Sequence, residues 1–275
     1  MFSIVLQAHK DNYTKFNNFD RNRHLVESDV FNSNMEQATS VIFENEENNS
    51  IKDESIKISH IGTDEIGIND YFGPVCVVSC FIDKSDFGWL DNYDFSNVKG
   101  LTQTEIIELA KIIKDQVIYS LLILDNPHYN KMVAEGLNPA SIKAKLYNQA
   151  ITNVMQKIKK PIHKKVIEQF VSPKTYYNYL KKEVIVVKNL DFDANAHEKY
   201  LAVSCAHILS RYASIQYFNN MTTKLKIKLP RGTNILVDKI GTQLVTTYGD
   251  AILNKVAKKH FANTRKILSL KNNKE

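Results

Sequence analysis

Short apolar runs typical of strands alternate along this sequence with segments in which apolar residues recur every three to four positions. The strand-like runs after residue 55 span 56–64, 74–82, 120–124, 164–170 and 183–188. The helical patterns cover 102–119, 138–158, 201–218 and 238–263. Because strands interleaved with helices pack as a sheet covered by helices, the pattern predicts an α/β layered domain.

Local signals support this division of the chain. The turn sequence EIGINDYFG separates the first two runs and predicts a hairpin. Thr102 and Glu105 have the spacing of a capping box, and Asn138 precedes a proline at the first position of the next helix. Gly249 interrupts the last helical segment, which therefore predicts one or two helices.

The first 57 residues differ from the rest in composition and charge. Residues 44–55, ENEENNSIKDES, are polar and predict a linker, and the strand-like runs 3–8 and 38–43 before it are too short to bury much of a core. Residues 1–57 carry 6 Lys and Arg against 10 Asp and Glu, whereas 58–275 carry 30 against 20. We therefore predict a small appendage, 1–57, and one large basic domain, 58–275. The basic charge favours a polyanionic partner, although lysine-rich composition is also general in proteins from A+T-rich genomes.

Other features of the sequence bear on its location. It contains no stretch of 18 or more uncharged apolar residues, so it predicts no membrane-spanning helix. The start, MFSIVLQAHKDN, lacks the basic region, apolar core and cleavage site of a secretion signal. Cys76, Cys80 and Cys205 are odd in number and lack the paired spacing of a metal site. These features predict buried, reduced thiols in a cytoplasmic protein without membrane contact.

Two adjacent acids, Asp64 and Glu65, stand at the end of the first predicted strand. Neighbouring side chains of a strand point to opposite faces, so two buried acids are costly there unless the backbone turns. Gly62 and Gly67 bracket the pair and would permit such a bend. Carboxylates gathered at a strand end suit hard cations such as Mg²⁺ or Mn²⁺, and the alternative is a solvated turn that happens to hold two acids.

The sequence around this pair resembles that of a known family. The segment IGTDEIGINDYFGPVCV (61–77) resembles the opening signature of ribonuclease HIII, in which an Asp–Glu pair precedes a glycine-rich turn. Further blocks follow in the same order as in that family: NPASIKAKLYNQAI (138–151), VIEQFVSPKTYYNYL (166–180), YLAVSCAHILSRYA (200–213) and VAKKHFANTRKIL (256–268). The resemblance covers about 58–268, nearly all of the basic domain.

The resemblance implies a ribonuclease H-like fold, with a central mixed five-stranded sheet flanked by helices. It implies cleavage of the RNA strand of an RNA–DNA hybrid to 5′-phosphate and 3′-hydroxyl ends, by two divalent ions held by four acids. The hybrid is then the expected partner of a protein that acts as a monomer without an obligate protein partner. Residues 1–57 would be a shortened remnant of the family's N-terminal domain, which resembles the TATA-binding protein.

Residue by residue, the four acidic positions are only partly kept. Asp64 and Glu65 match the first two acids, whereas the third position holds Glu168 where the family has Asp. The fourth position, where the family has Glu, falls on His197, which the resemblance places among the catalytic residues as a neighbour of the ions rather than a preferred ligand. Glu198 would replace the missing acid only if the helix start shifts. The implied metal ligands are therefore Asp64, Glu65 and Glu168, which would hold Mg²⁺ or Mn²⁺. The longer side chain of Glu168 suits Mn²⁺ better, because Mg²⁺ demands a stricter geometry.

The implied substrate contacts also depart from the family pattern. Its Gly-x-Gly turn corresponds to Gly67-Ile68-Asn69, so the second glycine is replaced, and the loop before Thr102 is shorter, with only Lys99 to stand in for its lysines. Phosphate contacts are expected from the second helix, although a solvated lysine face is the alternative for each; the residues are Lys143, Lys145 and Asn148. Two hypotheses follow: a hybrid-specific endoribonuclease, or a paralogue that binds hybrid or other nucleic acid without cutting it.

Overall fold

A computed structural model describes residues 5–7 and 57–272. Its strands are β1 Val5–Gln7, β2 His60–Ile66, β3 Val75–Ile82, β4 Ile118–Leu124, β5 Lys164–Glu168 and β6 Asp191–Asp193. Its helices are α1 Phe87–Leu90, α2 Gln103–Gln116, α3 Asn126–Ala134, α4 Pro139–Met155, α5 Pro173–Tyr179, α6 Ala196–Lys199, α7 Leu201–Leu225, α8 Ile235–Tyr248, α9 Ile252–Val256 and α10 Ala262–Asn272, with a 3-10 turn at Lys84–Asp86.

The strands form one mixed sheet in the order β1-β4-β3-β2-β5-β6. Strands β1 to β4 pair antiparallel, and β2, β5 and β6 pair parallel to one another. Residues 57–272 supply five strands, the number that the sequence predicts, and four of them lie at the predicted positions. The run at 3–8 supplies a sixth, because Val5–Gln7 pairs with β4 at the edge of the same sheet. The predicted strand 38–43 and the predicted linker 44–55 lie outside the described residues.

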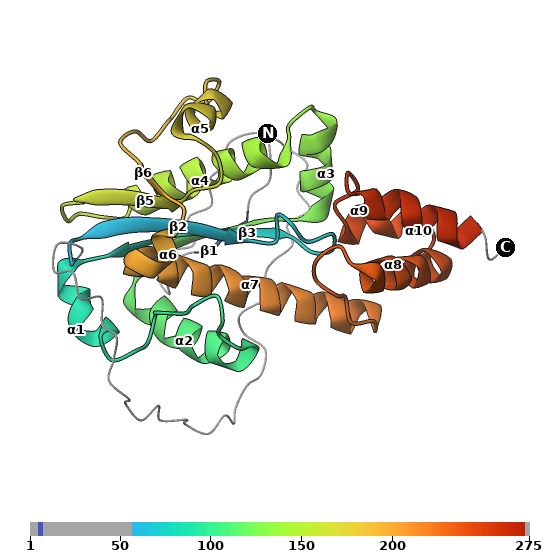
Figure 1. Cartoon of the computed structure of the whole chain (residues 1–275), viewed down its shortest axis with the longest axis horizontal. Coiled ribbons are helices and arrows are strands. Elements are labelled where there is room, and N and C mark those ends of the chain that lie inside the picture. Colours follow the sequence, from blue (N-terminus) through green and yellow to red (C-terminus); the bar gives the residue numbers. More distant parts are fainter. Residues whose placement is uncertain (1–4, 8–56, 273–275) are drawn as a thin grey trace.

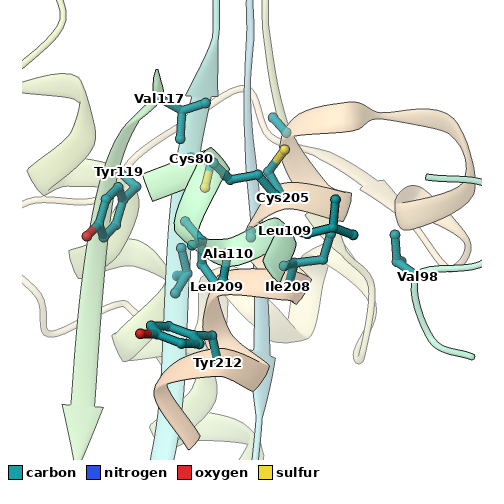
Figure 2. Packing of buried hydrophobic residues seen from close by; sticks show 14 of the residues in the cluster. Cys80, Val98, Leu109, Ala110, Val117, Tyr119, Cys205, Ile208, Leu209 and Tyr212 are labelled. Carbon is teal, nitrogen blue, oxygen red and sulfur yellow. The ribbon is translucent and has the colours of Figure 1, made fainter. Parts of the chain in front are cut away.

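Helices cover both faces of the sheet (Figure 1). Helices α7 and α2 pack on one face and α4 on the other, while α8, α9 and α10 gather at one end. The run 75–82 is buried along its whole length because alternate side chains enter different cores. Val78 and Cys80 face α7 and α2, whereas Val77 and Phe81 face α4. Figure 2 shows the first of these cores, where Cys80 and Cys205 lie among apolar side chains.

The three cysteines are free and buried, as predicted. Burial raises the pKa of the Cys76 thiol to about 12, which keeps it protonated. No helix among residues 57–272 has the length and apolar character needed to cross a membrane.

The local signals are confirmed where the sequence is most explicit. Strands β2 and β3 form the predicted antiparallel hairpin. Thr102 and Glu105 make a reciprocal capping box at the start of α2, and Asn138 caps α4. Gly249 ends α8 with a positive φ of 77°, so the last segment contains separate helices. Helix α3 is absent from the sequence prediction, although Asp125 caps it and a proline occupies its first turn.

The strand predicted at 183–188 is wrong. In place of a ladder, Ile185 and Val187 bond through their backbone to the side chain of Asn148 on α4. The fifth strand of the domain is instead the short β6, which pairs with β5. A run of β-branched residues becomes a strand only where a sheet edge is in reach, and β6 occupies that edge.

Candidate metal centre

The carboxylates of Asp64 and Glu168 come from neighbouring parallel strands. Thr63 on β2 pairs with Ile167 on β5, so the next residue on each strand, Asp64 and Glu168, lie side by side. Residues in register project to the same face of a sheet, which here is the face covered by α6 and α7. The topology therefore brings together two acids that are 104 positions apart in the printed sequence.

Asp64 is almost fully buried, at 4% exposed, and its carboxylate accepts three hydrogen bonds. The Glu65 amide donates to Oδ1 at 2.7 Å, the Tyr147 hydroxyl donates to Oδ1 at 3.3 Å, and His207 Nδ1 lies 2.7 Å from Oδ2. Burial by itself would raise the Asp64 pKa. The hydrogen bond and charge of His207, with Lys143 and the Glu65 amide, outweigh burial and leave that pKa below its usual value.

Glu65 points to the opposite face, toward α4. Its Oε1 accepts from Lys143 Nζ at 2.9 Å, and its Oε2 accepts from the Ile68 amide at 3.3 Å. Strand β2 continues through Ile66, so the backbone bends after the acidic pair rather than at it. The bend falls at Gly67, where φ is 101° and an added Cβ would lie 2.2 Å from the Pro74 carbonyl oxygen. Separate partners on each face, not a turn, therefore make the burial of two adjacent acids tolerable.

Glu168 ends β5 and binds His197 twice. The His197 amide donates to Oε2 at 3.2 Å, and His197 Nδ1 lies 3.1 Å from both carboxylate oxygens. Lys99 Nζ adds a bond to Oε1 at 3.2 Å. Arg211 on α7 holds the short loop that carries Lys99, because its guanidinium donates to the carbonyls of Val98, Lys99 and Leu101.

The residues that hold Glu168 bear on the fourth position of the site. The His197 ring is buried against the third acid, whereas the Glu198 side chain is 55% exposed. Lys99, the residue expected to stand in for the lysines of the shortened loop, reaches the same carboxylate.

The Tyr147 hydroxyl donates to Asp64 and lies within the electrostatic influence of all three acids. Burial raises the Tyr147 pKa well above its usual value, and the charges of Asp64, Glu65 and Glu168 raise it further. Carboxylate oxygens are the ligands that Mg²⁺ and Mn²⁺ prefer, so the donor set fits such ions in kind. No three His, Cys, Asp or Glu side chains within residues 57–272 form a ready-made cage. Two of the carboxylates also contact lysines, Glu65 with Lys143 and Glu168 with Lys99.

The other predicted contact residues divide into two groups. Gly67 and Asn69 lie on the turn after β2, where Asn69 is exposed and Ile68 is buried in the core beneath α4. Further along α4, Lys145 pairs with Glu183, and Asn148 is only 5% exposed. The Asn148 side-chain amide donates through Nδ2 to the Ile185 carbonyl and accepts through Oδ1 from the Val187 amide. In this structure Lys145 and Asn148 thus anchor the loop before β6.

The turn after β2 is tied to the C-terminal helices through Asp70. Its Oδ1 accepts from the Gly232 amide at 2.7 Å and its Oδ2 from Arg231 at 3.2 Å. Lys258, fully buried, donates to the backbone carbonyls of Asp70 and Gly73 at 2.8 and 2.7 Å. Burial lowers the Lys258 pKa to about 8, although the charge of Asp70 opposes the shift. The C-terminal block thereby fixes the turn next to the acidic pair.

Sequence reasoning missed three residues of this centre. Tyr147 and His207 lie within blocks that resemble the family, but the periodicity of α4 and α7 marks both positions as core. The only local signal for His207 is an ionisable residue in the apolar stretch that α7 buries nearly all round. Lys258 gives no signal, because a lysine is expected at the surface.

A mixed sheet flanked by helices, with carboxylates at the ends of two adjacent central strands, defines the ribonuclease H-like class of proteins. The model of the Ribonuclease HII family matches residues 61–264, and the chain belongs to that family.

Two related proteins carry the name ribonuclease HIII. The Bacillus mycoides (strain KBAB4) protein is 37% identical over 215 residues, which cover 78% of this chain and 69% of the relative. The Listeria monocytogenes serotype 4b (strain F2365) protein is 35% identical over 213 residues, covering 76% and 69%. The crystal structure of Bst-RNase HIII in complex with Mn²⁺ superposes with a TM-score of 0.78 at 25% identity, covering 86% of this chain and 77% of that one. The resemblance and the fold class drawn from the sequence are thus confirmed.

Proposed function

We propose that this protein hydrolyses the RNA strand of RNA–DNA hybrids, using two divalent ions bound by Asp64, Glu65 and Glu168. The observation that carries the proposal is the placement of Asp64 and Glu168 side by side at the ends of β2 and β5, with Glu65 next to Asp64 on β2. The family match over 61–264 and the Mn²⁺ complex of a structural neighbour support the same reading.

Asp64, Glu65 and Glu168 would hold the divalent ions, which would supply an activated water and stabilise the leaving 3′ oxygen. The side chains of the centre prepare for that chemistry. The Asp64 carboxylate is held ionised by its hydrogen bonds, and His197 orients Glu168 from its backbone amide and its ring. Lys143 and Lys99 pair with Glu65 and Glu168, and with ions on these acids the two lysines would be placed to bind phosphate oxygens of the hybrid. The products would carry 5′-phosphate and 3′-hydroxyl ends.

A second candidate function is binding of hybrid or other nucleic acid without cleavage. The observation that favours it is the pairing of each of the three carboxylates with a lysine or histidine of the protein itself. Ions must compete with these internal partners, and a chain in which they lose that competition would keep the fold and the basic surface alone.

One experiment separates the two candidates. Purified protein is incubated with a labelled hybrid in Mg²⁺ and in Mn²⁺, beside Asp64→Asn and a Glu168→Asp/His197→Glu variant that restores the family acids. Cleavage by the wild type that is lost in Asp64→Asn supports the nuclease. Silence from the wild type together with activity in the restored variant refutes it. If neither the wild type nor the restored variant cleaves, but the wild type binds hybrid with an affinity that falls steeply with salt concentration, the non-cleaving binding function is supported.

The remaining proposals concern the substrate contacts and the setting of the protein. Gly67 and Asn69 would approach the hybrid backbone from the turn, and Lys145 and Asn148 would do so from α4 once released from the loop that they anchor. Residues 1–57 would act as a reduced substrate-binding appendage to a catalytic domain at 58–275. Buried free thiols favour a cytoplasmic protein, and we propose that it acts as a monomer.

A further inference from the structure

His207 is the buried side chain in closest contact with the acid at the heart of the site. Its Nδ1 lies 2.7 Å from Asp64 Oδ2, and the ring is 6% exposed. An ionised carboxylate only accepts hydrogen bonds, so Nδ1 is the donor whichever charge the imidazole carries. The sequence pattern gives this histidine no role, and the mechanism proposed above uses it only as one of the hydrogen-bond donors to Asp64.

The packing of α7 on β2 dictates where His207 lies. At Gly62 the two elements approach so closely that an added Cβ would be 2.2 Å from the Val203 amide nitrogen. From Val203 to His207 the helix rises about 6 Å. From Gly62 to Asp64 the strand advances about 6.6 Å. Helix and strand thus advance in step from their point of contact, and the imidazole arrives at the carboxylate.

The contact restricts how Asp64 can present its oxygens. Oδ1 already accepts from the Glu65 amide and from Tyr147, which uses both of its lone pairs. Oδ2 accepts from His207 and keeps one lone pair free. With three donors from β2, α4 and α7, the carboxylate plane is fixed, and a single direction on Oδ2 is left for a ligand.

We propose that His207 is a positioning residue that orients Asp64 for divalent-ion binding. The proposal rests on the proposed function, since it assigns Asp64 to an ion site. Hydrogen-bond partners of ligating carboxylates are known to set metal affinity, and their loss typically costs about 10–100-fold in affinity. A histidine that served packing alone would leave that affinity unchanged when replaced by an apolar side chain of similar volume.

The test compares His207→Leu with His207→Asn. Leucine fills a similar volume without a donor, whereas the asparagine amide can place an N–H near the position of Nδ1. Mn²⁺ binding is measured without substrate by titration calorimetry and by the electron paramagnetic resonance signal of free Mn²⁺. Circular dichroism establishes that each variant is folded. We expect His207→Leu to bind Mn²⁺ at least about tenfold more weakly, and His207→Asn to stay within about threefold of the wild type.

Two results would overturn the proposal. In the first, the leucine variant is folded and binds Mn²⁺ as tightly as the wild type or more tightly, which makes His207 a packing residue or a competitor of the ion. In the second, leucine and asparagine variants lose affinity equally, so that the donor is irrelevant. An Asp64→Asn arm separates this failure from that of the proposed function. If Mn²⁺ binding is absent in the wild type, or unchanged in Asp64→Asn, the ion site itself is refuted and His207 has nothing to position.

Discussion

The ion pair between Lys143 and Glu65 gives the sharpest prediction about stability. Their side chains are 10% and 8% exposed, and Nζ lies 2.9 Å from Oε1. At an effective dielectric constant of about 20, two unit charges at that separation attract by roughly 6 kcal/mol before desolvation is subtracted. Removing one partner of such a pair strands the other charge, at a cost of about 3–5 kcal/mol.

Lys143→Met should therefore lower the free energy of unfolding by about 3 kcal/mol, toward the lower end of that range, because the Ile68 amide still donates to Glu65. Adding Glu65→Gln removes the stranded charge, and the double variant should return to within about 1 kcal/mol of the wild type. Urea denaturation in the presence of a chelator measures all four members of the cycle. The reasoning is refuted if Lys143→Met loses less than about 1 kcal/mol, or if the double variant is no more stable than the single one.

The stability of the same four proteins can also be measured as Mn²⁺ is added. If the ion binds Glu65, it supplies the positive charge that Lys143→Met removes, so the stability deficit should shrink as Mn²⁺ is added. A deficit that stays constant at every Mn²⁺ concentration would show that Glu65 is not a ligand. The Glu65→Gln variant serves as the control, because it offers the ion one charge fewer.

Three further predictions concern packing, pH and the loop at 183–187. Gly62→Ala should lower the free energy of unfolding by about 1–3 kcal/mol or more, because its Cβ meets the backbone of α7. Gly88→Ala, with open space around it, should leave stability unchanged, and equal melting temperatures for the two variants would contradict this. The folded pKa of Lys258, about 8, lies below its usual 10.5, so the unfolded chain binds more protons between these values. Wild-type stability should therefore rise with pH across that window relative to Lys258→Met, by up to about 3 kcal/mol, and parallel curves would refute the claim. Asn148→Ala removes two hydrogen bonds to the loop and should speed tryptic cleavage after the flanking Lys182 and Lys188 about tenfold. An unchanged rate would show that the loop is held by other contacts.

Much of the fold follows from neighbours in sequence. Helix caps at Thr102 and Asn138, the end of α8 at Gly249 and the hairpin before β3 depend on residues a few positions apart, so their patterns are legible in the chain. The acidic pair belongs to the same category, since adjacent carboxylates before a glycine turn are a local motif. The run at 183–188 marks the limit of this reasoning, because a strand needs a free edge that no local pattern specifies.

The composition of the centre depends on the tertiary structure. The contact of Asp64 with His207 joins residues 143 positions apart, and that of Lys99 with Glu168 joins residues 69 apart. Each follows from strand register, from the close approach of α7 at Gly62, or from the loop that Arg211 holds. By itself the sequence determined that the chain carries an acidic pair in a ribonuclease H-like sheet. Only the packing of helices on that sheet decided which cations and donors contact each acid, because burying a carboxylate without a partner is unfavourable in free energy.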